Sequence, residues 1–164
     1  MNNFIRNIYY FALKCWNWFI PHFKKVIYVG EYVTDRNFGD ALNFVLLPAI
    51  THRKLIPKRY CFSFQYEENE NVLFIGSIIR TSTNQSIVWG AGAISHNDEV
   101  KGVKEILSVR GPLTRDILCK QGYNCPPVYG DPALALPLFY KPHSKNGGGG
   151  GKKDRFYPTL FGQR

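Results

Sequence analysis

The chain lacks the short motifs by which many enzyme classes are identified. No two of its 4 cysteines form a CxxC pair, and no histidine lies at zinc-ligand spacing from them, so we predict reduced thiols and no metal site. Neither the Gly-x-Gly-x-x-Gly fingerprint nor a P-loop lysine motif occurs. No Ser-His-Asp or Cys-His arrangement is evident either, and His96 beside Asn97 and Asp98 is expected at the surface. No cofactor is therefore predicted, and no residue is assigned a catalytic role.

The positive charge of the chain is concentrated near its two ends. The formal net charge is +9, of which residues 1–25 contribute +4 and residues 143–164 contribute +4, leaving +1 for the central part. A surface that follows the phosphates of a nucleic acid needs basic residues clustered on the folded body. We therefore predict no nucleic-acid partner.

The N-terminal segment is rich in aromatic residues but has no long uninterrupted apolar run. Lys14 and Asn17 interrupt residues 3–20, which are too polar to span a bilayer and lack a secretory cleavage site. We expect an amphipathic aromatic helix within residues 1–24, ended by Pro21. Its apolar stripe has helical spacing and consists of Phe4, Ile8, Phe11, Cys15 and Phe19. The helix either packs on the domain or makes peripheral contact with an anionic membrane surface.

Residues 25–142 show strands alternating with helices. Helices are expected from Asp40 to about residue 50 and from Pro112 to Gly122. Strands are expected at residues 25–30, 60–64, 72–75, 87–89, 106–109 and 127–129. This alternation predicts an α/β fold, a Rossmann-like parallel sheet with helices on both faces. Residues 143–164, with five consecutive glycines, are expected to form a disordered Gly/Lys-rich tail.

Small-residue loops follow four of the expected strands. Ligands of α/β sheets bind outside the carboxyl ends of the strands, and glycines there leave backbone N–H groups open to an anion. The predicted substrate-binding residues are Asn37, Gly39, Asp40, Gly76, Ser77, Gly90, Gly92, Arg110, Thr114 and Asp131.

Three of these residues have a plainer structural interpretation. The guanidinium of Arg110 can grip a carboxylate or phosphate, but it could instead form an ion pair with Asp116 or Asp131. Asp40 could simply cap the helix that follows it. Asp131, which precedes Pro132, could stabilise a turn.

Five segments, in this order, resemble the polysaccharide pyruvyl transferases: NFGDALN at 37–43, FIGSIIR at 74–80, IVWGAGAIS at 87–95, VRGPLTRDIL at 109–118 and VYGDPALALP at 128–137. The resemblance covers roughly residues 26–142. It implies one lobe of a two-lobed fold similar to the GT-B glycosyltransferases.

The same resemblance implies a reaction and its partners. Pyruvate passes from phosphoenolpyruvate to a saccharide or lipid-linked saccharide acceptor as a ketal, in cytoplasmic assembly of exopolysaccharide or capsule. Arg110 corresponds to the arginine of the family's RxxxS/T segment, with Thr114 as its hydroxyl partner, and would hold the donor. Asp40 would orient or deprotonate a sugar hydroxyl.

Family members are longer and carry a second lobe, which would begin soon after residues 140–142. The glycine run suggests a frameshifted, truncated product that is inactive alone. Two other functions fit the residues: a GT-B-like lobe that uses a nucleotide sugar, and a non-enzymatic membrane-associated module.

Overall fold

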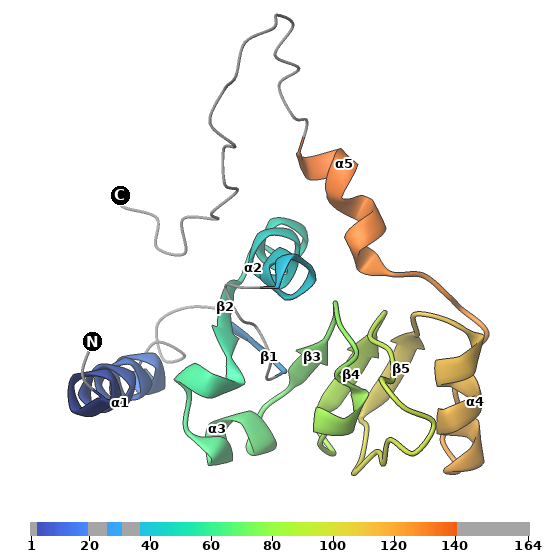
Figure 1. The fold of residues 1–164 in the computed structure, drawn as a ribbon, viewed down its shortest axis with the longest axis horizontal. Coiled ribbons are helices and arrows are strands. Elements are labelled where there is room, and N and C mark those ends of the chain that lie inside the picture. The colour runs from blue at the N-terminus through green and yellow to red at the C-terminus, as the bar shows by residue number, and fades with distance from the viewer. Residues whose placement is uncertain (1–2, 20–25, 31–36, 141–164) are drawn as a thin grey trace, which may run out of the picture.

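The computed structural model describes residues 3–19, 26–30 and 37–140. Its five strands form one parallel sheet in the order β2-β1-β3-β4-β5 (Figure 1). This confirms the predicted Rossmann-like α/β fold. The chain passes from β1 to one neighbour, β2, and then crosses back to β3 on the other side of β1, so the topological switch point lies between β1 and β3. The strands are β1 (Val26–Val29), β2 (Lys54–Pro57), β3 (Asn71–Leu73), β4 (Ser86–Trp89) and β5 (Glu105–Ser108).

Helices cover both faces of the sheet because side chains alternate along each strand. On one face, the strands pack against α2 (Phe38–Thr51) and α5 (Leu136–Phe139). Buried residues of this face include Ile27, Val29, Leu46, Leu47, Val72 and Phe74. A Phe74–Trp89 ring contact, with centroids 4.9 Å apart, links neighbouring strands there.

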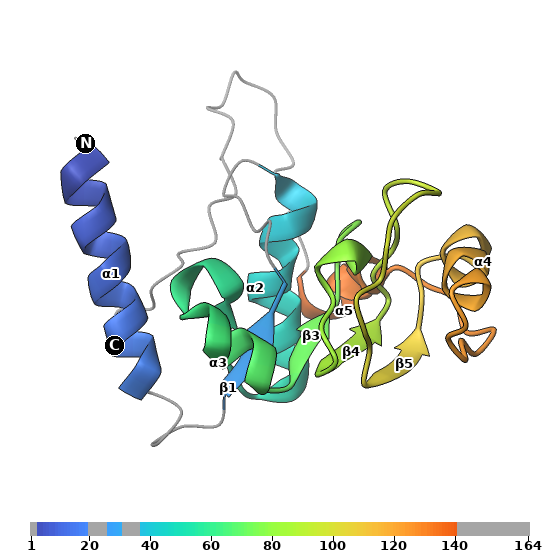
Figure 2. The same cartoon turned by 90° about the horizontal axis from the view of Figure 1, so that it is seen from below.

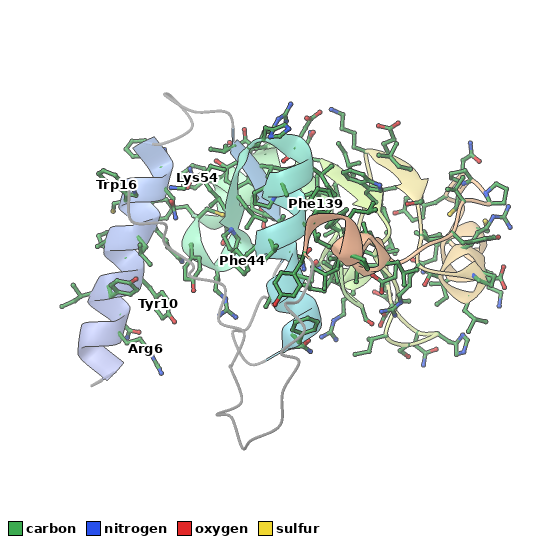
Figure 3. All side chains as sticks on the ribbon, turned by 90° about the horizontal axis from the view of Figure 1, so that it is seen from above. Arg6, Tyr10, Trp16, Phe44, Lys54 and Phe139 are labelled. Atoms are coloured by element: carbon green, nitrogen blue, oxygen red, sulfur yellow. The ribbon has the colours of Figure 1, made fainter. Side chains whose placement is uncertain are left out.

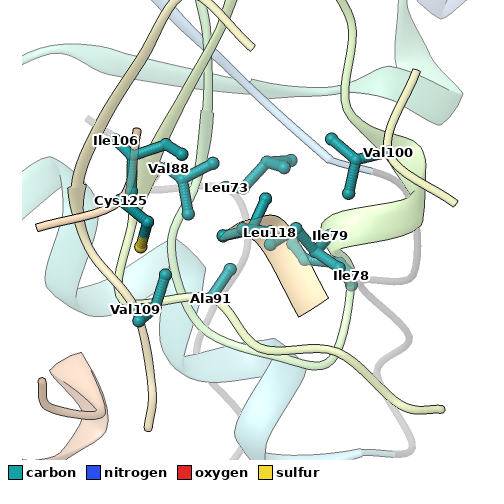
Figure 4. Close-up of a cluster of buried hydrophobic side chains, with 10 residues drawn as sticks. All are labelled: Leu73, Ile78, Ile79, Val88, Ala91, Val100, Ile106, Val109, Leu118 and Cys125. Carbon is teal, nitrogen blue, oxygen red and sulfur yellow. The ribbon is translucent and has the colours of Figure 1, made fainter. Parts of the chain in front are cut away.

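The opposite face is covered by α3 (Ser63–Glu68) and α4 (Pro112–Lys120). Tyr66 of α3 packs with Tyr28 and Ile56. Leu118 of α4 packs into a second group of buried side chains (Figure 4), which come from β3, β4, β5 and the segments that follow β4, β5 and α4. They include Leu73, Val88, Ala91, Ile106, Val109 and Cys125.

Two predicted strands are wrong. Residues 60–64 hold the end of the 3₁₀ helix η2 (Lys58–Tyr60) and the start of α3. The Phe62 N–H donates to the Gln65 side chain at 3.1 Å, and this capping contact favours a helix despite the aromatic composition. The strand lies earlier, at β2. Residues 127–129 form only the isolated bridge between Val109 and Tyr129, since a proline-rich approach offers few N–H donors for a ladder.

The start of α2 also corrects a prediction. The N-cap is Asn37, whose Oδ1 accepts from the N–H of Gly39 at 2.9 Å and of Asp40 at 3.3 Å. Asp40 therefore lies in the first helical turn and does not cap the helix. The end of α4 agrees with expectation, since Gly122 follows it with φ +87.

Helix α1 (Asn3–Phe19) confirms the N-terminal helix and packs beside η2. Figure 2 shows α1 at the edge of the domain, on the same side as α3. Tyr10 stacks on Tyr60 with ring centroids 5.8 Å apart, and buried Asn17 donates to the Tyr60 carbonyl at 2.8 Å. Ile8 and Phe11 of the predicted apolar stripe stay 54% and 62% exposed. The helix thus packs on the domain by one side and leaves apolar side chains in solvent.

No helix within the described ranges is both long and apolar enough to cross a bilayer. The predicted helix end at Pro21 and the predicted tail at 143–164 lie outside the described residues.

Candidate functional site

All the predicted site residues except Asp131 lie in loops and helix starts that follow β1, β3, β4 and β5. Asp131 follows the isolated bridge at Tyr129. Three of these loops are joined by backbone hydrogen bonds. Gly92 N–H donates to the Gly76 carbonyl at 2.9 Å, Ile79 N–H to Gly92 at 3.2 Å, and Arg110 N–H to Ala91 at 3.2 Å. The carboxyl edge of the sheet is therefore one connected framework.

Arg110 reaches from the end of β5 across the other two loops. Its Nη2 donates to Ser77 Oγ at 2.8 Å and to the Ala93 carbonyl at 3.1 Å. A Cβ placed on Gly92 would lie 2.6 Å from Arg110 Nε, so only glycine leaves room for the guanidinium. Within residues 37–140 it forms no ion pair with Asp116 or Asp131, which removes the plainer interpretation of this arginine.

Thr114 acts on the loop instead of contacting the guanidinium. It is buried in the first turn of α4, and its Oγ1 accepts the Ala93 N–H at 3.1 Å. Arg110 binds the carbonyl of the same residue. Thr114 and Arg110 therefore bind the N–H and the carbonyl of Ala93. The hydroxyl of Thr114 is linked to Arg110 through Ala93 and does not contact it directly.

Asp40 lies against the loop after β3. Its Oδ1 is 3.6 Å from the position of a Cβ on Gly76, which has φ +124. Burial raises the pKa of the Asp40 carboxyl, and the charge of Arg59 partly opposes that rise. Because Gly76 is hydrogen-bonded to Gly92, Asp40 and Arg110 stand beside one joined pair of glycine loops.

Asn43 positions Asp40 and was missed as a site residue. Its side chain donates to the Ile75 carbonyl at 3.0 Å and accepts the Ile75 N–H at 3.0 Å. It also donates to the carbonyl of Asp40 at 3.0 Å. A polar residue on the buried face of an apolar helix, one turn after Asp40, is the sequence signal that could have revealed it.

Asp131 begins a turn at the margin of the site, and Gly90 lies against the proline that follows it. Asp131 Oδ1 accepts the Ala133 N–H at 2.9 Å and caps the 3₁₀ helix η4 (Pro132–Ala135), so its turn role is confirmed. Gly90 has φ +92, and a Cβ there would lie 2.3 Å from Pro132. The Asp131 carboxylate is thus engaged by the backbone.

The arrangement offers one cation, one half-buried carboxylate and several glycine loops. No hydrogen bond within the described residues engages Nε or Nη1 of Arg110, which leaves these donors available to an anion. In the same part of the chain, no group of three His, Cys, Asp or Glu side chains could hold a metal ion.

No family model matches this sequence, and no solved structure matches it. The chain is similar to the uncharacterized protein L143 of Acanthamoeba polyphaga mimivirus, at 28% identity over 117 residues. The matched segment is 71% of this chain and 40% of that protein. The chain thus spans well under half the length of this relative.

Proposed function

We propose that this chain is the first lobe of a polysaccharide pyruvyl transferase-like enzyme, with phosphoenolpyruvate bound at the loops after β3, β4 and β5. The observation that supports this most is the placement of Arg110. Its guanidinium lies across two glycine loops at the carboxyl edge of a parallel sheet, with Nε and Nη1 open. Phosphoenolpyruvate is small and carries a carboxylate and a phosphate, both of which suit such donors.

The reaction needs two proton transfers besides anion binding. Two sugar hydroxyls form C–O bonds to C2 of the donor, while its C2–O bond to phosphate breaks. One hydroxyl proton is matched by protonation of C3, which becomes a methyl group. The other is taken up by the inorganic phosphate that leaves. Asp40, with its pKa raised by burial, is suited to accept a hydroxyl proton near neutral pH. Arg110 stabilises negative charge on the donor and the leaving phosphate.

A second lobe of the GT-B kind would complete the crevice. The matched segment is only 40% of the mimivirus relative, so proteins of this kind have room for one. The proposed location is cytoplasmic, with peripheral contact of residues 3–20 at the inner face of the membrane.

Thermal unfolding of the full chain with phosphoenolpyruvate tests the proposal. At ten times its Kd, the ligand should stabilise the fold by about 1.4 kcal/mol, a rise in Tm of roughly 4 °C. Arg110→Ala should abolish the rise, while Lys120→Ala, an equal charge change at the exposed end of α4, should keep it. No rise with phosphoenolpyruvate, but one with nucleoside diphosphates, would replace this function by the nucleotide-sugar alternative.

A further inference from the structure

A basic hollow lies between α1 and η2 and shares no lining residue with the candidate site around Arg110. Its volume is about 600 Å³. Figure 3 shows Arg6 and Tyr10 on the side of α1 that faces the rest of the domain. The lining residues are Arg6, Asn7, Tyr10, Phe11, Lys14 and Arg59. Three of these are cations and none is an acid.

The three cations are brought together by both helices. Arg6, Tyr10 and Lys14 recur every four residues and therefore share one face of α1. Arg59 comes from η2, directly after β2. The Tyr10–Tyr60 stack and the Asn17–Tyr60 hydrogen bond hold η2 against that helix.

No acid lines the hollow to balance this positive charge, and the described acid that interacts with it electrostatically is Asp40, through Arg59. No ion pair among the described residues engages Arg6, Lys14 or Arg59. Arg59 instead lies over the Tyr60 ring, with Cζ 5.9 Å from the centroid. Like charges around one hollow repel each other, and an anion in the hollow removes that cost.

Apolar groups border the same helix on its other sides. Ile8, Phe11 and Trp16 are each more than half exposed. A second groove of about 450 Å³ separates α1 from β2 and α2, and Figure 3 shows Phe44 and Lys54 on its far side. It is lined mainly by apolar and aromatic side chains: Tyr9, Leu13, Trp16, Phe44, Leu55, Pro57 and Tyr60, with Asn17 and Lys54.

We propose that α1 and η2 form a binding site for an anionic phospholipid of the bilayer, with its phosphate between Arg6, Lys14 and Arg59. The complementarity of charge selects a phosphate head group, and the adjoining aromatic surface selects a lipid over a soluble anion. The exposed side chains Phe11 and Trp16 then lie at the head-group level. This inference rests only on the membrane-contact part of the proposed function and does not depend on pyruvyl transfer.

The proposed lipid site also orients the carboxyl edge of the sheet. Because η2 follows the carboxyl end of β2, it lies at the same edge of the sheet as the loops after β1 and β3. Arg59 acts electrostatically on Asp40, which places the basic hollow beside the candidate site. A lipid held there turns the carboxyl edge of the sheet toward the membrane surface.

Sedimentation of the full chain with vesicles tests the site. One set is phosphatidylcholine alone, and the other is phosphatidylcholine mixed with phosphatidylglycerol. The mixed vesicles should bind the chain more tightly. Each of Arg6→Ala, Lys14→Ala and Arg59→Ala should weaken this binding about fivefold, and the triple variant on the order of a hundredfold. Arg59→Lys should bind like the wild type, because it keeps the charge.

Lys120→Ala is the matched control, since it removes one exposed charge from α4 at the other end of the sheet. It should change vesicle binding by less than about twofold. Equal loss in Lys120→Ala, or wild-type binding in the triple variant, would overturn the site. Equal binding to both vesicle sets would show that the chain does not prefer anionic lipid and would overturn the anionic-phospholipid assignment. Binding to neither set would overturn the membrane contact as well, while the phosphoenolpyruvate measurement would stand separately.

Inorganic phosphate distinguishes the two sources of the anion. Phosphate is added at an ionic strength at which chloride alone does not weaken vesicle binding. It should leave the binding unchanged, because inorganic phosphate lacks the acyl chains of a lipid. Complete displacement by phosphate, with none by chloride at equal ionic strength, would show a soluble-anion site and overturn the lipid assignment.

Discussion

The guanidinium of Arg110 is hydrogen-bonded to the hydroxyl of Ser77, a residue 33 positions earlier in the chain, at 2.8 Å. The bond joins the loop after β5 to the loop after β3 across the intervening loop of β4. It helps to fix the plane of the guanidinium, whose Nε and Nη1 make no hydrogen bond within the described residues. Ser77 therefore positions the cation on which the proposed donor site depends.

Replacement of Arg110 by lysine should weaken phosphoenolpyruvate binding by roughly tenfold or more, although the charge is kept. An ammonium group cannot hold Ser77, Ala93 and a planar anion with a rigid fork of donors. Ser77→Ala should cause a smaller loss, because the Ala93 contact still orients the guanidinium. Isothermal titration calorimetry would measure both, and wild-type affinity in Arg110→Lys would rule out a forked anion contact.

Gly90→Ala and Gly122→Ala should differ in their cost although both glycines have positive φ. The Cβ of alanine at position 90 would lie 2.3 Å from Pro132, while nothing lies within 4 Å at position 122. We expect Gly122→Ala to lower the free energy of unfolding by about 1 kcal/mol, the backbone cost alone. Gly90→Ala should cost about 3 kcal/mol because overpacking adds to it. Urea unfolding would compare them, and equal costs would contradict the observed contact.

Loss of the Asn43 side chain should destabilise the fold by about 2–4 kcal/mol. Asn43→Leu leaves both the N–H and the carbonyl of Ile75 without their buried partner. Thr51→Ala is the control on the same helix, because Thr51 bonds only the carbonyl of Leu47 in its own helix. It should cost no more than about 0.5 kcal/mol in the same urea unfolding series. Similar costs for the two variants would mean that the link from α2 to β3 adds little.

The carboxyl of Asp40 should make stability fall as pH rises. Its pKa in the folded chain is raised above the unfolded value of 3.8 by burial, so the folded state binds the proton more tightly than the unfolded state does. The resulting stabilisation is complete below the unfolded pKa and disappears as pH rises through the folded pKa. Asp40→Asn should therefore gain in Tm relative to the wild type as pH rises above the unfolded pKa of 3.8. A difference in Tm that does not change with pH would contradict the raised pKa.

Local patterns predicted the parallel fold and the four site loops, because glycine, proline and alternating apolar runs act over short stretches of chain. They wrongly predicted a strand at residues 60–64, where Tyr60 stacks on the Tyr10 ring of α1. That contact joins segments 50 residues apart, and no local rule contains it. The sequence predicted a side-chain cap at the start of α2 but assigned it to Asp40 instead of Asn37. Both residues carry a side-chain oxygen that can cap a helix, and they lie three positions apart.

The members of the candidate site were easier to predict than their contacts. Position at a strand end is set by the chain order, so Ser77, Gly92 and Arg110 meet as expected. The hydrogen-bond partners of these side chains are set by tertiary geometry. For that reason Thr114 binds the Ala93 N–H and does not bind Arg110 directly. Asn43 was overlooked for the same reason, since its partners are backbone groups of another element.

The bonds that join the loops after β3, β4 and β5 run between main-chain groups, from Gly92 to Gly76, Ile79 to Gly92 and Arg110 to Ala91. Backbone groups are present whatever the side chain, so the shape of this edge is insulated from most substitutions that respect its glycines. A descendant of this sequence could exchange the chemistry it displays there without rebuilding the support beneath it. The backbone of this edge would stay the same, and new binding properties would arise from changes in the few side chains that it carries.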